Sequence, residues 1–108
     1  MISFLPKRVD FSKLRWETPV PGIRYKIYRQ GDKQIRFVEL KSGFVESDWC
    51  TRGHIGYILK GKLKVKFVDK SLIFNYGDAF SIPAGRKSKH KAYPLTSLVR
   101  LFLVEDDF

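Results

Sequence analysis

The feature that most constrains the fold is a series of short extended segments separated by turn residues. In residues 62–67, KLKVKF, lysines alternate with apolar residues, which is the period of a strand with one face buried and the other in water. The only helical candidate is a single turn starting at Ser12, because Pro19 and Pro21 would stop it. Seven or eight short strands predict an all-β barrel or sandwich. The other extended segments are residues 23–28, 35–40, 44–50, 54–59, 71–76, 79–82 and 98–104.

Turn residues indicate how these strands are connected. Gly31 and Asp32 separate residues 23–28 from residues 35–40, which predicts a hairpin with these two residues near its tip. Lys60 and Gly61 predict a second tight turn, in which Gly61 occupies a hairpin position with positive φ. Pro83 is expected to end a strand, because proline has no N–H to donate to the sheet.

Length and composition favour one globular domain in a reducing compartment. The chain has 108 residues, 44% of them hydrophobic, which is enough for a single core. Its one cysteine excludes an internal disulfide. Neither a signal sequence nor a membrane span is recognisable, so we expect a cytoplasmic protein without membrane contact.

The charge is strongly basic, with a formal net charge of +10. A basic surface suits nucleic acid, but the positive residues are spread along the chain, and no nucleic-acid-binding motif is present. The lysines of residues 62–67 are expected to face water and to protect an exposed strand. The densest cluster is RKSKHK, residues 86–91. Contact with nucleic acid is therefore the less favoured alternative.

Two motifs resemble those of the cupin superfamily. GDAFSIPAG, residues 77–85, is similar to the second cupin motif, and HIGYILKGKLKV, residues 54–65, is similar to the end of the first. The resemblance implies a cupin double-stranded β-helix, or jelly-roll barrel, of unassigned function. We expect one domain, residues 1–108, with residues 1–22 as an N-terminal extension and about residues 35–104 as the conserved barrel. Small cupins commonly form homodimers, and the extension offers a segment that reaches a neighbour.

The resemblance also implies candidate metal ligands. Metal-binding cupins use two histidines and an acidic residue in the first motif and a histidine in the second. Counting back from the motif glycine places His54 on the acidic position, and Cys50 and Asp48 on the histidine positions. Ser88 stands on the second-motif position, and His90 lies two residues later. A Cys/His/His set with Asp48 suits zinc or iron, with nickel a further possibility.

Geometry and packing supply alternatives to the metal site. On a straight strand four residues span about 13 Å, so Cys50 and His54 share an ion only if residues 51–53 bend the chain, which Gly53 permits. Otherwise Cys50 is a packing residue, Asp48 caps a turn, and His90 is exposed among lysines.

Three further residues are candidates for binding a small molecule: Tyr57, Trp49 and Arg36. Aromatic residues are more often core, and Arg36 equally suits the solvent face of the first hairpin. The favoured function is binding of a divalent metal, a small-molecule ligand or both at the barrel mouth. The alternative is a metal-dependent enzyme of oxygenase or isomerase type acting on a small metabolite. Both functions share every motif, so whether the protein is an enzyme stays open.

Overall fold

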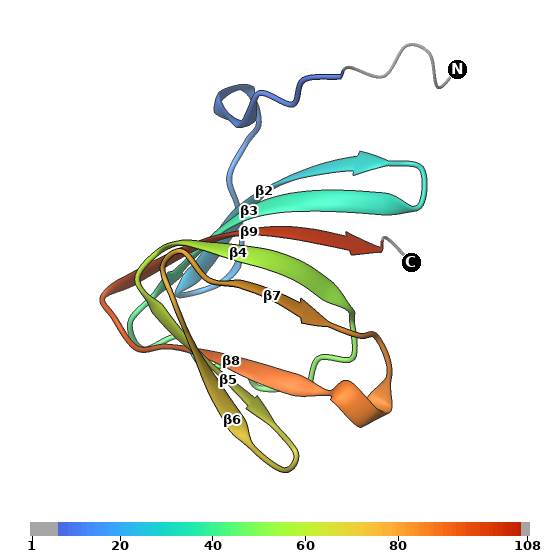
Figure 1. Cartoon of the computed structure of the whole chain (residues 1–108). Coiled ribbons are helices and arrows are strands. Elements are labelled where there is room, and N and C mark those ends of the chain that lie inside the picture. Colours follow the sequence, from blue (N-terminus) through green and yellow to red (C-terminus); the bar gives the residue numbers. More distant parts are fainter. Residues whose placement is uncertain (1–6, 107–108) are drawn as a thin grey trace.

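The computed structural model describes residues 7–106, and its strands form two antiparallel sheets that face each other (Figure 1). The larger sheet has the order β1-β2-β3-β9-β4-β7, and the smaller has the order β6-β5-β8. The expected all-β jelly-roll architecture is confirmed. No helix within the described residues has the length and apolar content needed to cross a bilayer. The strands are Glu17–Val20 (β1), Ile23–Gln30 (β2), Lys33–Lys41 (β3), His54–Lys60 (β4), Lys62–Phe67 (β5), Ser71–Asn75 (β6), Ala79–Ile82 (β7), His90–Pro94 (β8) and Leu98–Asp106 (β9).

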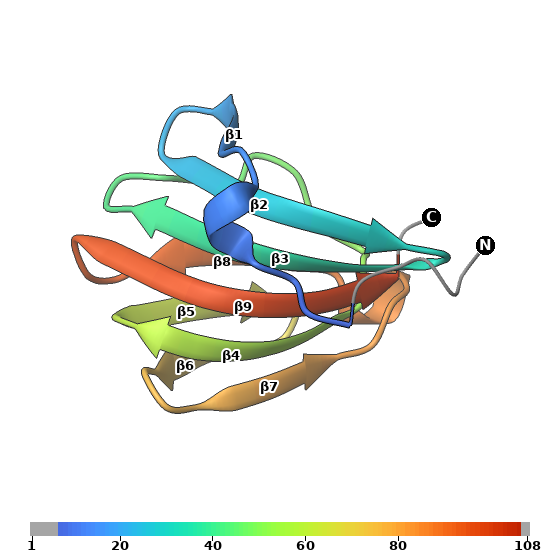
Figure 2. The ribbon, with the colours of Figure 1, turned by 90° about the horizontal axis from the view of Figure 1, so that it is seen from above.

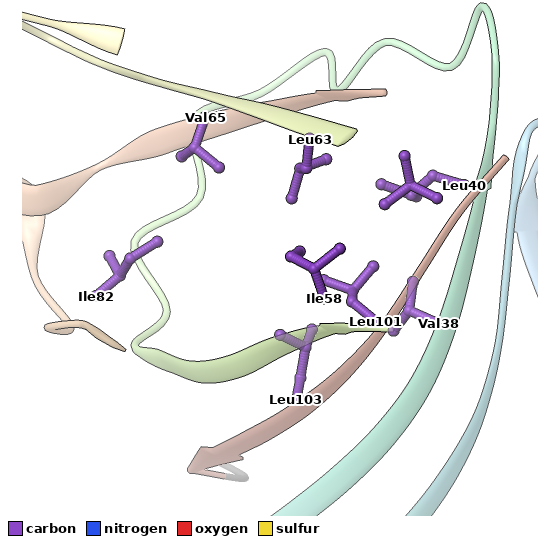
Figure 3. Packing of buried hydrophobic residues seen from close by; sticks show 9 residues of the cluster. Val38, Leu40, Ile58, Leu63, Val65, Ile82, Leu101 and Leu103 are labelled. Carbon is purple, nitrogen blue, oxygen red and sulfur yellow. The ribbon is translucent and has the colours of Figure 1, made fainter. Parts of the chain in front are cut away.

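The core lies between the two sheets and follows from the alternation of apolar residues along the strands. In β5, Leu63 and Val65 point inward, and Figure 3 shows them facing Ile58 of β4 and Leu101 of β9. Fully burying a side chain of this size stabilises the fold by about 1.5–3 kcal/mol. The packing of these inward faces therefore holds the sheets together and sets the space between them.

The connections agree with the expected turns in one case and differ in another. β2 and β3 form the expected hairpin, closed by Gly31 and Asp32 between Gln30 and Lys33. The prediction of a second hairpin was wrong, because β4 and β5 belong to different sheets. Gly61 does adopt a positive φ of 84°. It turns the chain from one sheet into the other rather than closing a hairpin.

The segment before β2 packs on the outer face of the chain's own larger sheet. The short 3-10 helix η2, Phe11–Lys13, is capped by Asp10, whose side chain accepts a hydrogen bond from the Ser12 N–H. The ring of Phe11 lies 5.8 Å from that of Phe37 in β3, and β1 pairs with β2 (Figure 2). The described part of the extension, residues 7–22, therefore folds back on its own sheet.

Two strands were missed from the sequence, and one expected segment is not a strand. β1 contains Pro19, which is tolerated there because β1 is an edge strand. β8 begins at the end of the basic stretch, residues 86–91, and the polar composition of that stretch hid it. Residues 44–50 form no strand and pair only at Cys50, through a single bridge to His90.

Candidate metal site and cavity

The inward faces of the two sheets line a partly open cavity of about 120 Å³. Most of its wall is apolar and comes from both sheets and from the segment between β3 and β4. One end is polar. The wall includes Leu40, Phe44, Leu63, Phe80 and Leu101, and the polar end includes Arg36, Cys50, His54 and His90.

Cys50, His54 and His90 come together at this polar end. Their candidate ligand atoms all lie within 4.8 Å of one another, and Cys50 Sγ is 3.6 Å from His54 Nε2. The two imidazole rings meet edge to face with their centroids 5.0 Å apart. Within residues 7–106 this is the one such group of potential metal ligands.

The backbone explains why residues four apart in sequence converge. Cys50 and His90 exchange two backbone hydrogen bonds of 2.8 and 3.0 Å, which hold Cys50 beside the start of β8. Residues 51–53 then turn the chain into β4, which begins at His54. A Cβ on Gly53 would lie 2.9 Å from the backbone nitrogen of Ala84, so only glycine allows this close approach. The chain therefore bends at residues 51–53, which is the condition for Cys50 and His54 to share one metal ion.

A buried carboxylate holds His54 in place. Glu105 of β9 has a fully buried side chain, and its Oε2 lies 2.5 Å from Nδ1 of His54. Arg36 donates two hydrogen bonds of 2.7 Å to the same carboxylate, and Gln34 donates one of 2.8 Å. Nε2 of His54 is thereby left to face Cys50. This arrangement, a carboxylate behind a histidine, is common behind metal ligands.

Burial and these contacts act in opposite directions on the two charged groups. Burial alone would raise the pKa of Glu105, but hydrogen bonds from His54, Arg36 and Gln34 outweigh it and hold the pKa well below its usual range. Burial likewise opposes a charged His54, but the contacts with Cys50 and Glu105 raise the pKa of its ring. The network therefore keeps the Glu105 carboxylate ionised inside the fold.

His90 is held in the same manner but by the backbone. Its Nδ1 donates a 2.9 Å hydrogen bond to the carbonyl oxygen of Ser88, at the end of the short 3-10 helix η3, Arg86–Ser88. The ring is buried, and its Nε2 has no hydrogen-bond partner. A buried polar atom without a partner costs free energy, so an unpartnered nitrogen beside a thiol and a second imidazole fits a ligand position.

The separations between donor atoms fit a transition-metal ion. For tetrahedral Zn²⁺, bonds of about 2.3 Å to sulfur and about 2.05 Å to nitrogen place the S and N donors about 3.6 Å apart and two N donors about 3.3 Å apart. The Cys50–His54 separation of 3.6 Å matches the first of these values. The largest separation in the group, no more than 4.8 Å, requires a shift of about 1.5 Å at most.

The other residues singled out from the sequence lie in different places. Arg36 lines the cavity, but its guanidinium is paired with Glu105. Asp48 is exposed and is not part of the ligand group. Tyr57 is 44% exposed, because the inward positions of β4 are those of His54, Gly56 and Ile58 and Tyr57 alternates with them.

Trp49 is not among the residues that line the cavity. The ammonium groups of Lys89 and Lys91 lie over the Trp49 ring, each 5.1 Å from the ring centroid. Glu105 was missed from the sequence, although its alternation with Leu101 and Leu103 already places it on the inward face of β9.

No protein-family model matches the sequence, and no curated protein matches it. Solved structures do match. KdgF from Halomonas sp. is 23% identical with a TM-score of 0.75, covering 90% of this chain and 91% of that one. An RmlC-like cupin from Shewanella frigidimarina is 11% identical with a TM-score of 0.74, covering 96% and 93%. The polyketide cyclase RemF from Streptomyces resistomycificus is 19% identical with a TM-score of 0.75, covering 96% and 81%. These likenesses show the fold, so the expected cupin fold is confirmed.

Proposed function

We propose that this protein binds a divalent transition metal through Cys50, His54 and His90 and uses it to hold a small molecule in the cavity between the sheets. The observation that carries the proposal is the buried, unpartnered Nε2 of His90, close to a thiol and to the Nε2 of a second histidine. Nδ1 of His90 donates to a backbone carbonyl, and Nδ1 of His54 lies 2.5 Å from a carboxylate oxygen of Glu105. Both rings therefore present Nε2 to the same point.

The donor set favours zinc over harder ions. One sulfur and two imidazole nitrogens suit zinc, whereas a set rich in carboxylates suits magnesium or calcium. Iron and nickel stay in the proposal as the other metals that imidazole binds. Three protein ligands leave a coordination position for water or a ligand, and a metal there supplies Lewis-acid chemistry.

The cavity limits what the ligand can be. A volume of about 120 Å³ admits a molecule of a few heavy atoms, on the scale of a cavity that holds one benzene ring. The walls are mostly apolar, although Glu46 and Arg52 also line the cavity, and the Arg36 guanidinium is already engaged by Glu105. The proposed ligand is therefore a small, largely apolar molecule with one donor atom for the metal.

Metal content provides the direct test. We expect about one zinc, iron or nickel per chain in purified, untagged protein measured by plasma mass spectrometry. Cys50→Ala and His54→Ala should each lose the metal. Asp48→Ala is the matched control, because this exposed carboxylate is not part of the ligand group, and it should retain the metal. Absence of metal after reconstitution, or an equal loss in Asp48→Ala, would contradict the proposal.

Cobalt substitution adds a readout of the ligand atoms themselves. Co²⁺ bound to a thiolate has a sulfur-to-metal charge-transfer band, which Cys50→Ala should remove. His90→Ala should weaken binding and leave that band in whatever metal remains bound. A cobalt spectrum without a thiolate band would show that Cys50 is a packing residue.

A second candidate is catalysis at the same metal. The open coordination position beside a mostly apolar cavity favours it, and the similar structure of RemF is that of a polyketide cyclase. Turnover of a small metabolite by the metal-loaded protein, abolished in His54→Ala, would establish an enzyme. Binding that perturbs the cobalt spectrum without turnover would establish a binding protein.

The homodimer remains a prediction, but a different part of the chain now supports it. Residues 7–22 pack on their own sheet, so the described extension no longer supports it. Instead, Ile55, Tyr57 and Leu59 are exposed at successive outward positions of β4, where a second copy would cover them. Gel filtration at low micromolar concentration that gives only a 12.6 kDa species would contradict the dimer.

A further inference from the structure

Lysines that are separated in the sequence lie together on the outward face of the small sheet. In β5 the buried Leu63 and Val65 face the core, so Lys62, Lys64 and Lys66 lie on the opposite face. β8 follows the same rule, since His90 and Ala92 line the cavity and Lys91 and Tyr93 point outward. The side of the sheet opposite the metal site is therefore basic.

Sheet pairing brings these residues side by side. β8 lies beside β5 (Figure 1). The register of this pair places Lys64 opposite Tyr93 and Lys66 opposite Lys91. On the other side of β5, Ile73 of β6 is opposite Lys64. The outward set consists of Lys62, Lys64, Lys66, Ser71, Ile73, Asn75, Lys91 and Tyr93, and it contains no acidic residue.

Among the described residues, the lysines of this face have no acidic partner, unlike several basic residues of the larger sheet. On the larger sheet, Arg24 and Arg100 pair with Glu39, and Lys33 pairs with Asp106. Within residues 7–106, no carboxylate lies within ion-pair distance of any of the four outward lysines. Asp48 and Asp69 lie in loops outside the three strands.

Aromatic rings lie among these charges. Lys64 Nζ is 6.0 Å from the ring centroid of Tyr93. At the edge of β8, Trp49 precedes Cys50, which forms a bridge to His90. The ammonium groups of Lys89 and Lys91 lie 5.1 Å from the centroid of the Trp49 ring. Positive charge combined with aromatic faces on a sheet is the composition of surfaces that bind single-stranded nucleic acid, where lysines contact phosphates and rings stack on bases.

We propose that the outward face of β5, β6 and β8, together with Trp49, binds single-stranded nucleic acid. Along β5 the three lysines are about 7 Å apart, and three strands make a face about 10 Å wide, a size suited to a few nucleotides. Bases offer their flat faces to Tyr93 and Trp49 only when they are unpaired, which favours a single strand over a duplex. The site lies on the opposite side of the sheet from the metal group and does not depend on it.

The test is fluorescence anisotropy with a labelled twelve-residue oligothymidylate at several salt concentrations. Four lysines that neutralise phosphates give a slope of log K against log salt of about −2.8, so binding weakens about 50-fold between 50 and 200 mM salt. The variant Lys64→Gln/Lys66→Gln/Lys91→Gln removes three of these contacts and should reduce the slope by about 2.

A matched variant separates this face from overall charge. Lys13→Gln/Arg15→Gln/Lys41→Gln removes the same charge at three exposed positions outside the small sheet and should bind like the unaltered protein. Tyr93→Leu should weaken binding about tenfold through lost stacking. Circular dichroism and metal content, unchanged in all variants, show that each is folded.

Several outcomes would overturn the proposal. One is that the oligonucleotide does not bind at 50 mM salt. Another is that both triple variants lose the same amount of binding. A third is that a duplex of the same length binds as tightly as the single strand and Tyr93→Leu has no effect. Stronger binding to vesicles of phosphatidylcholine and phosphatidylserine than to the oligonucleotide would assign the face to a lipid surface instead.

Discussion

Replacing Glu105 by glutamine probes the buried network behind the candidate metal site. The side chain of Glu105 is fully buried, accepts hydrogen bonds from Arg36 and Gln34, and contacts His54. Glutamine has the same shape but lacks the charge, and its amide brings N–H donors among groups that are themselves donors. The substitution therefore leaves the charge of Arg36, whose side chain is only 18% exposed, without its partner.

The magnitude follows from burial. Removing one partner of a buried ion pair costs about 3–5 kcal/mol. Because glutamine retains the shape and one acceptor oxygen, we expect the lower end, about 3 kcal/mol. For a domain of this size that lowers Tm by about 12 °C or more. It is also a large share of the roughly 5–15 kcal/mol that stabilises a typical domain.

Glu39 supplies a matched control for this substitution. It too pairs with two basic residues, but the side chains of Arg24 and Arg100 are 44% and 36% exposed, so water can replace the lost partner. We expect Glu39→Gln to cost only about 1 kcal/mol. Urea unfolding followed by circular dichroism, with equal m values, measures both changes.

The comparison of the two variants decides the question. A cost for Glu105→Gln near 1 kcal/mol, or equal to that of Glu39→Gln, would show that the buried network does not form as described. The double variant Arg36→Met/Glu105→Leu provides a further check. It should be clearly more stable than Glu105→Gln, since it leaves no unpaired buried charge.

Three further outcomes are expected. Burial alone would raise the pKa of Glu39, but hydrogen bonds from two arginines outweigh burial and lower this pKa. The stabilisation of the fold by ionised Glu39 is therefore complete above about pH 4.5 and is lost as pH falls through the lowered pKa. Glu39→Gln should flatten the acid side of a stability–pH profile. Gly61→Ala should cost about 3 kcal/mol in urea unfolding, because Gly61 has a positive φ and an added Cβ would lie 2.3 Å from a backbone carbonyl oxygen of β9. Gly31 also has a positive φ but open space around it, so Gly31→Ala should cost about 1 kcal/mol. Leu63→Ala should cost about 2–5 kcal/mol by thermal or urea unfolding and Leu59→Ala less than about 1, and similar values for both would contradict the placement of the core.

Much of the secondary structure could be predicted from the sequence, because alternation and turn chemistry are local. The β2–β3 hairpin follows from alternating residues around Gly31 and Asp32, and the inward positions of β5 follow from KLKVKF. The error at Gly61 has a clear origin. A positive-φ glycine between two strands signals a change of direction, but it does not say whether the strands pair with each other or with others.

The candidate site was predictable in its members but not in its geometry. Cys50 and His54 were identified through the cupin resemblance, and the bend at Gly53 was the stated condition for their convergence. His90 was ambiguous, because its neighbours are lysines and it lies two residues after the motif position, where Ser88 stands. Glu105 had a signal in its alternation with Leu103, yet no local pattern indicates which buried group a carboxylate will meet.

The sequence by itself determined that the chain forms an all-β domain with lysine-bearing outer strand faces and a few possible metal ligands. Only the tertiary structure decided that β8 lies beside β5, which turns His90 inward next to Cys50 and places Lys91 and Tyr93 outward beside Lys64. The reason is physical. Strand period depends on neighbouring residues, whereas pairing partner and register are set by how two distant apolar faces pack together.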